Sequence, residues 1–453
     1  MPPEIGSPAT EGASTTTCAR RTVDHSACDA RALRALEDFA DRVLSLAQGA
    51  ERILDALQAD PDEPSLRLAA AFFWLFGQTA QAQTEAARHL DVARAGASRL
   101  NPRERAWLHA LDAWHAKAFD AAATRFEAIT AAWGADLLAL RAAEFLYYVL
   151  GQQHCGPRYA AHTERLAVEH GADPDFLAMH AFANELCGRM DAARRHAEQA
   201  IGLRARNPWA QHALAHVFAQ EGNVAAAAAL MERWLADWPR SARTVYCHDA
   251  WHLALLHLDR LEVDRAFAVY DEHVWGRTPD SVVEQLDAIA FLWRAEMAGV
   301  AVEAARWRSI LPHVRSAWPT LFMPFVSAHY AYALARAGDV EEAEALLRLT
   351  DARAAQDDEE ALRVWRPAGR GIVRAAARLG SDDARAAADE LEPVMSLMTR
   401  IGGSDAQDDL FRFAFVDSLS RCGRRADAAA YLRGRMSRKP ASPLEVKLLG
   451  ALT

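Results

Sequence analysis

Residues 173–235 read DPDFLAMHAFANELCGRMDAARRHAEQAIGLRARNPWAQHALAHVFAQEGNVAAAAALMERWL, and this stretch decides the fold. Pro174 and Pro208 lie 34 residues apart, and so do Gly188 and Gly222. A proline at the first position of a helix loses nothing by its missing N–H, and each glycine precedes a second, alanine-rich helix. A period of 34 residues with two helices per unit is typical of tetratricopeptide repeats.

The same second-helix pattern recurs along the chain, as AFDAAATRFEAI from residue 118, VDRAFAVYDEHV from 263, GDVEEAEALLRL from 338 and GRRADAAAYLRG from 423. We therefore expect an all-α tetratricopeptide-repeat solenoid of about ten helix pairs. Residues 1–30 are rich in Ser, Thr, Pro and Gly and are expected to form a disordered tail. Residues 31–453 then form a single solenoid, regular over 101–276 and less regular over 300–400, where proline and tryptophan cluster.

Composition limits the expected partners and compartment. The formal net charge is -10 and the pI is near 5.9, which argues against a basic nucleic-acid surface. No apolar run approaches the roughly 18 residues that a membrane helix needs, and the N-terminus lacks the apolar segment of a secretory signal. Six scattered cysteines without a CxxC pair indicate reduced thiols. We expect a cytoplasmic protein with no nucleic-acid and no membrane partner.

Two pairs of histidines stand out in neighbouring units. His212 and His216 are four residues apart, and so are His248 and His252. Residues four apart share one face of a helix, and the first helices of tetratricopeptide units line the groove. Imidazole is the commonest neutral metal ligand and titrates near neutral pH. These four residues are the candidate metal ligands, for a transition metal, and with Asp249 they are the candidate catalytic residues.

One feature of the spacing argues against a four-histidine cage. Aligning Val224 with Val263 places Trp251, not His252, opposite His212. A shift of one residue turns a side chain by about 100° around a helix. We therefore expect the two pairs to point in different directions. The alternative is a structural role, in which the histidines pack between helices and bond to backbone carbonyls.

Other side chains complete the candidate site. The expected ligand-binding residues are two tryptophans, two acidic residues and one glutamine: Trp209, Trp251, Glu185, Asp271 and Gln407. Gln407 is also placed to close a capping box with Ser404. Cys247 paired with His216 is a candidate nucleophile, although a buried structural cysteine is more common.

Five segments resemble the tetratricopeptide repeat protein 38 family: NPRERAWLHAL at 101–111, WAQHALAHV at 209–217, CHDAWHLAL at 247–255, YDEHV at 270–274 and GGSDAQDD at 402–409. The similarity extends over nearly the whole chain after the tail, and it implies the repeat fold rather than an activity. Three positions depart from the family pattern. Asp249 stands where the family prefers Asn, Asp408 where it prefers Arg, and Ala219 replaces a Glu.

Two functions remain open from the sequence. The first is a binding scaffold that holds a peptide or small-molecule ligand in a groove lined by His and Trp. The second is an enzyme of unusual fold that uses the histidines, with a metal or as acid and base, on a small-molecule substrate. A purely structural homodimer built on exposed helix faces is a third interpretation. No Walker loop, dinucleotide-binding turn, HExxH or GxSxG motif is present to decide for an enzyme.

Overall fold

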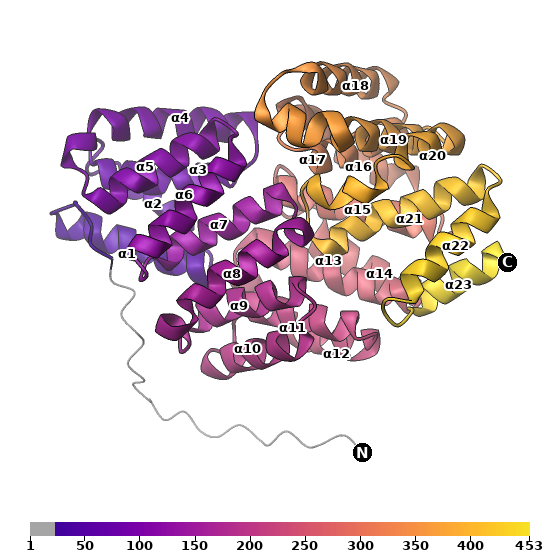
Figure 1. Cartoon of the computed structure of the whole chain (residues 1–453), viewed down its shortest axis with the longest axis horizontal. Helices are drawn as coiled ribbons and strands as arrows, with labels where there is room; N and C mark the ends of the chain where they lie inside the picture. The colour runs from indigo at the N-terminus through magenta and orange to yellow at the C-terminus, as the bar shows by residue number, and fades with distance from the viewer. Residues whose placement is uncertain (1–22) are drawn as a thin grey trace.

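The computed structural model describes residues 23–453, and these fold into helices connected by short turns (Figure 1). Within this range the only strand-like feature is an isolated bridge between Ala47 and Ser241. The expected all-α solenoid is confirmed. Most of the expected N-terminal tail, residues 1–22, lies outside the described residues. The chain just after it is docked, because the amide of Ser26 donates to the Glu104 carboxylate over 3.1 Å.

The expected repeat is present in the structure. Asp173 and Asn207 cap two helices with their side chains, and Pro174 and Pro208 occupy the first position of each. Each helix pairs with the alanine-rich helix that follows it. Small alanines let the two helices approach closely, and the large apolar side chains fill the space between successive pairs.

The first part of the chain forms one end of the molecule, drawn in indigo to purple in Figure 1. Asn101 and Glu104 form a capping box at the start of α5. Aromatic side chains dominate the packing here, as where the rings of Trp114 and Phe145 stack at 5.2 Å. The helices of this part are α1 (Ala30–Ser45), α2 (Ile53–Ala56), α3 (Pro64–Leu75), α4 (Ala80–Ala95), α5 (Pro102–His115), α6 (Phe119–Ala132), α7 (Leu137–Leu150) and α8 (Gln152–His170).

The middle of the chain carries the histidine pairs and continues the alternation of first and second helices. A short π-helical segment at Tyr270–Val274 directly continues the helix Val263–Val269. The helices are α9 (Pro174–Leu186), α10 (Met190–Leu203), α11 (Pro208–Gln220), α12 (Val224–Trp234), α13 (Arg243–Asp259), α14 (Val263–Val269) and α15 (Val282–Met297).

The last part contains several interruptions of regular helix. Pro312 lies inside a helix, a π-helical segment spans Ala361–Gly369, and a 3-10 segment spans Met395–Arg400. The helices are α16 (Ala304–Ala317), α17 (Pro324–Arg336), α18 (Val340–Ala355), α19 (Arg370–Gly380), α20 (Ala384–Leu391), α21 (Asp405–Arg421), α22 (Arg425–Met436) and α23 (Pro443–Leu452). Among residues 23–453, no helix is both long and apolar enough to cross a bilayer.

The solenoid curls back on itself, so that its C-terminal helices lie beside its middle (Figure 1). Helix α21 packs against α15, and α23 packs against α13. The Gly402–Gly403 turn that precedes α21 is joined to the end of α7, since Gly403 N donates to Tyr148 O and Gln152 N donates to Gly403 O, each over 3.0 Å. This closure brings the first residue of α21 to the histidine-bearing helix α11.

Candidate metal centre

The four histidines of α11 and α13 converge on one buried point. The Nε2 atom of His252 lies 3.3 Å from Nε2 of His216 and 3.3 Å from Nε2 of His248. The ring of His212 completes the group, with its centroid 4.7 Å from that of His252 and 5.3 Å from that of His248. The structure therefore assembles all four residues that the sequence singled out.

The expectation that the two pairs point in different directions is wrong. In the structure His248 and His252 stand opposite His212 and His216, a register of 36 residues rather than the 39 that separate Val224 from Val263. The difference lies after His252, because α13 continues for seven residues beyond it whereas α11 ends four residues after His216. An alignment of the second helices, Val224 with Val263, therefore includes three residues at the end of α13 that have no counterpart in α11.

Two of the imidazole rings are held by buried carboxylates. His212 donates from Nδ1 to Asp249 over 2.9 Å, and His248 donates from Nδ1 to Asp287 over 3.1 Å. When the carboxylate is ionised it accepts the proton of Nδ1, and the lone pair of Nε2 is then directed away from it. In histidine metal sites, the ligating imidazole usually donates its other ring N–H to a carboxylate in this way.

The spacing of the nitrogen donors suits a transition metal. His212, His248 and His252 each place one ring nitrogen within 4.8 Å of the others. Zn–N bonds of about 2.0–2.1 Å in a tetrahedral site set neighbouring ligand atoms roughly 3.3–3.4 Å apart. The 3.3 Å separation between the Nε2 atoms of His248 and His252 matches that edge. Three histidines with one further position open form the ligand set of a catalytic zinc site.

Burial keeps two of these rings in the neutral form that binds metals. Burial, reinforced by neighbouring histidines, holds the pKa of His212 and the pKa of His252 well below the usual range. Burial and the charge of Asp287 raise the pKa of Asp249 well above its ordinary value. A cation at the centre would favour the ionised carboxylate and the unprotonated Nε2 atoms together.

The two tryptophans expected at the site pack against the histidine cluster. Trp209 stacks on His212 with centroids 4.7 Å apart, and Trp251 stacks on His248 at 5.2 Å. The Trp209 indole N–H donates to Glu144 over 2.8 Å, and the Trp251 ring is fully buried. Both residues thus fix the orientation of the imidazoles, and neither presents a free face to a groove.

The remaining candidates fall in different places. Glu185 lies beside His216, with Oε1 3.5 Å from Nδ1. Gln407 accepts from the amide of Ser404 and closes the capping box, which is the structural alternative that the sequence allowed. Asp271 lies outside the cluster and pairs with Arg306.

Cys247 is not placed as a nucleophile. Its thiol is buried and donates to the carbonyl oxygen of Thr244 over 3.3 Å. Burial, followed by the charges of Asp287 and Glu284, raises the pKa of this thiol well above its ordinary value. A thiol held in its protonated form is a poor nucleophile.

A cavity of about 90 Å³ opens beside the cluster. His216 and His252 form one wall, so an ion at the centre would be reached from this side. The polar residues of the other walls are Gln220, Asp259, Arg294, Asp405, Asp409 and Lys439. Together with Asp287, these are the functional candidates that sequence reasoning missed. Only Asp405 and Asp409 carried a signal, because both belong to the GGSDAQDD segment.

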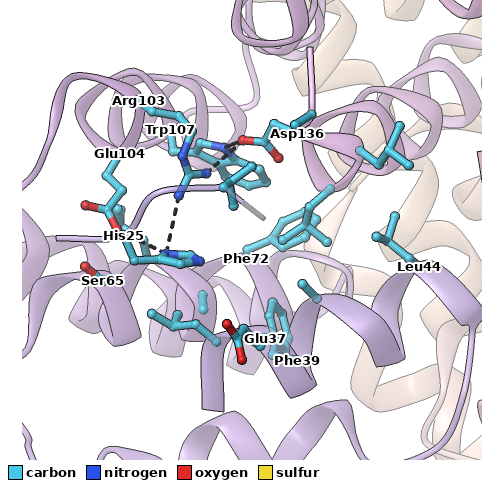
Figure 2. Close-up of a pocket in the computed structure, with 18 of the residues that line it drawn as sticks. His25, Glu37, Phe39, Leu44, Ser65, Phe72, Arg103, Glu104, Trp107 and Asp136 are labelled. Carbon is cyan, nitrogen blue, oxygen red and sulfur yellow. Dashed lines mark hydrogen bonds and ion pairs between the residues drawn. The ribbon is translucent and has the colours of Figure 1, made fainter. Parts of the chain in front are cut away.

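A larger cavity of about 280 Å³ lies at the other end of the molecule, between α1, α3, α5 and the start of α7 (Figure 2). Its walls are mostly apolar, with Phe39 and Phe72 among them. Figure 2 shows Arg103 at one side, bonded to Asp136 over 2.8 Å and to His25 over 3.3 Å. Sequence reasoning did not find this cavity, because its walls come from four helices without a shared motif.

No family model matches the chain. Two solved structures have a similar arrangement of helices. One is the human IFIT1 dimer with m7Gppp-AAAA, at 15% identity and a TM-score of 0.44, covering 94% of this chain and 95% of that one. The other is a monomeric IFIT1 mutant with Gppp-AAAA, at 15% identity and a TM-score of 0.38, covering 94% and 92%. The similarity concerns the fold alone, and membership of the protein 38 family stays a prediction from the motifs.

These structures correct one expectation. We predicted a peptide or small-molecule partner and excluded nucleic acid because the chain is acidic. The two IFIT1 structures contain m7Gppp-AAAA and Gppp-AAAA, which are nucleic-acid ligands. Net charge describes a whole surface, whereas a ligand meets only the residues of one groove. An acidic net charge therefore does not exclude a nucleic-acid partner, and the predicted partner class is withdrawn.

Proposed function

We propose that the chain is a helical-repeat binding scaffold whose central site holds one transition-metal ion, with zinc as the first choice. The ligands are the Nε2 atoms of His212, His248 and His252. The observation that carries the proposal is the anchoring of two Nδ1 atoms on the buried carboxylates Asp249 and Asp287. A purely structural histidine needs a partner for one nitrogen, but nothing in packing requires several Nε2 atoms to face one another.

The surroundings support this reading. Nε2 of His252 lies 3.3 Å from Nε2 of both His216 and His248, and a single N–H on this nitrogen can donate to only one of them, which leaves a buried nitrogen without a partner. An ion among these imidazoles satisfies their buried lone pairs at once. The second helices supply no donor to the cluster, so the site is made entirely by first helices and by the closure of the solenoid.

Metal content of the purified, tag-free chain tests the proposal. We expect about one zinc-class ion per chain in the wild type, from a three-histidine site, and its loss in His212→Gln and His248→Gln. His162→Gln is the matched control, because His162 is also fully buried but bonds to Thr130 and Tyr147 instead. Equal metal content in His162→Gln, His248→Gln and the wild type would reject the site.

A metal-dependent hydrolase is the second candidate function, and the cavity beside the cluster favours it. A bound zinc ion lowers the pKa of its water to about 7. Asp259 lines the same cavity, and burial raises its pKa to about 6, which suits a general base near neutral pH. Arg294 and Lys439 add positive charge that fits an anionic group, such as a phosphate ester.

Zinc-loaded wild-type protein and Asp259→Asn, assayed on p-nitrophenyl phosphate and bis(p-nitrophenyl) phosphate, test this second candidate. General-base catalysis contributes about 10²–10⁴-fold, so we expect a loss of that order in Asp259→Asn with metal content unchanged. Turnover that is equal in both proteins, or absent from the zinc-loaded wild type, rejects it.

A further inference from the structure

We propose that Glu185, His216 and Asp405 form a second cation site, next to the three-histidine site and separated from it by the ring of His216. This inference rests on the proposed function, because it adds a second ion to the proposed metal centre. The three residues come from α9, α11 and α21, and each offers one donor atom within 4.8 Å of the others. All three side chains are buried.

The distances within this group differ from those of hydrogen bonds. His216 Nδ1 lies 3.5 Å from Glu185 Oε1 and 3.7 Å from Asp405 Oδ1. N–H···O bonds are about 2.7–3.2 Å long, and the contacts of His212 with Asp249 at 2.9 Å and of His248 with Asp287 at 3.1 Å fall in this range. Separations of 3.5–3.7 Å instead suit two ligands of one ion with bonds of about 2.0–2.2 Å. His216 thus lacks the close carboxylate bond that fixes His212 and His248.

Glu185 provides an independent observation. Both of its carboxylate oxygens are buried, and within the described part of the chain neither accepts a hydrogen bond. A buried carboxylate without partners is costly and rare in proteins. The Nδ1 atom of His216 lies 3.5 Å from its Oε1, and Asp405 offers a carboxylate oxygen within 4.8 Å. A divalent cation between these groups supplies the missing partner.

The ring of His216 connects the two donor groups. Its Nδ1 faces the carboxylates of Glu185 and Asp405, while its Nε2 lies 3.3 Å from Nε2 of His252. The Nδ1 atom of this imidazole is therefore the nitrogen offered to the second site, while its Nε2 atom borders the first site without being one of its three ligands. The cavity that reaches His216 and Asp405 also gives an ion and its water ligands a route to the second site.

The two sites differ in the metal ions that their donor atoms favour. Three imidazole nitrogens suit zinc or copper, whereas one imidazole with two carboxylates suits harder ions such as Mn²⁺ as well as zinc. The first site should therefore fill with Zn²⁺, and the second should accept Mn²⁺ in its presence. Two nearby ions of this kind are found in hydrolytic centres.

The test uses the full chain after removal of metal by a chelator. One equivalent of Zn²⁺ is added, then Mn²⁺, and bound Mn²⁺ is measured from the loss of the free-ion electron paramagnetic resonance signal. We expect the wild type to bind Mn²⁺ in addition to Zn²⁺. Glu185→Gln and Asp405→Asn should bind Zn²⁺ but weaken Mn²⁺ binding at least tenfold. Asp408→Asn is the matched control, since Asp408 is a buried carboxylate of the same helix α21 outside both donor groups.

The outcomes separate this inference from the proposed function. Suppose that the wild type binds zinc but no Mn²⁺, and that the wild type and Glu185→Gln each bind one zinc ion. This result overturns the second site and leaves the first intact. Two zinc ions in the wild type and one in Glu185→Gln supports the second site with a different ion. A wild type that binds neither ion overturns both proposals.

A measurement on the wild type alone covers the case in which a variant does not fold. Crystals grown with Zn²⁺ should give two anomalous peaks at the zinc edge, one on each side of the His216 ring. A single peak among the Nε2 atoms, with none beside Glu185, overturns the second site.

Discussion

The amide nitrogen of Gly403 donates to the carbonyl oxygen of Tyr148 over 3.0 Å, and this bond joins the start of α21 to the end of α7. Two residues later in the chain Asp405 begins α21 and stands 3.7 Å from His216. The closure of the solenoid therefore brings the Asp405 carboxylate to the histidine cluster, which α11 and α13 form by themselves. Residues that form the closure should affect metal binding without touching an ion.

Gly403→Ala should destabilise the fold and weaken the metal centre. Gly403 has a φ of 93°, and a Cβ atom there would lie 2.8 Å from the ring of Phe325. The left-handed conformation alone costs about 1–2 kcal/mol for a residue with a Cβ, and the contact adds to it. Urea unfolding should show a loss of at least about 2 kcal/mol.

Gly202→Ala is the control for that measurement. Gly202 lies in α10, and a Cβ atom there would have no neighbour within 4 Å. Alanine favours helix over glycine by about 1 kcal/mol, so this variant should be equally or more stable. A Gly403→Ala protein as stable as Gly202→Ala would show that the turn tolerates a side chain.

Asp287→Asn should lower the affinity for zinc without removing a ligand. Asp287 accepts from His248 Nδ1 through both of its oxygens at 3.1 Å. Loss of such a carboxylate typically lowers metal affinity about 10–100-fold, because the ligand is less well oriented and less basic. Competition with a chromophoric chelator measures the change. Unchanged affinity would mean that His248 is not a ligand.

Removal of the metal should lower the thermal stability. An ion that binds only the folded state stabilises it by about 2.7 kcal/mol at a free concentration of 100 times Kd. Scanning calorimetry with and without excess Zn²⁺ should therefore show a higher Tm with the ion. The shift should vanish in the double variant His212→Gln/His248→Gln, and a shift of the same size there would place the zinc elsewhere on the chain.

His329 should make the fold sensitive to acid. Burial lowers its pKa from 6.5 to about 4, and its Nδ1 donates to the carbonyl oxygen of Phe325 over 2.8 Å. Between pH 6.5 and pH 4 the unfolded chain binds a proton that the folded chain does not. The free energy of unfolding should thus fall by about 1.4 kcal/mol per pH unit from this residue as the pH decreases. Urea unfolding of His329→Gln should show a shallower decline than the wild type over this range, and parallel curves would contradict the assignment.

Arg435 should be required for docking the C-terminal helices. Its guanidinium is buried and bonds to Asp409 over 2.5 Å and to Glu445 over 2.7 Å, so it ties α22 to α21 and α23. Removing one partner of a buried ion pair costs about 3–5 kcal/mol. Here Glu445 loses its cation, whereas Asp409 keeps Arg412 and Lys439, so the lower end of that range applies. Arg435→Met should therefore lose stability of this order in urea unfolding. Arg433→Met, on the same helix, is the control, and an equal loss in both variants would show that the ion pairs contribute little.

The sequence determined the fold class through local rules. The 34-residue spacing of Pro174 and Pro208, their capping residues and the alanine-rich second helices specify helix pairs that stack on their neighbours. The i,i+4 spacing of His212 and His216 likewise set each histidine pair on one helical face. The capping box at Ser404 and Gln407 was predictable for the same reason, since its contacts lie within four residues.

Only the tertiary structure decided how these elements meet. The register between α11 and α13 depends on how far each helix extends past its histidines, and a repeat alignment does not contain that length. Asp287 joins the centre from α15, which packs directly on α13, and Asp405 joins it from α21 because the solenoid curls back through the Gly403 turn. Helix periodicity acts over a few residues, whereas the direction of a superhelix sums small packing angles over every pair of helices. Contacts between distant units follow from that sum, and no local stretch of sequence encodes it.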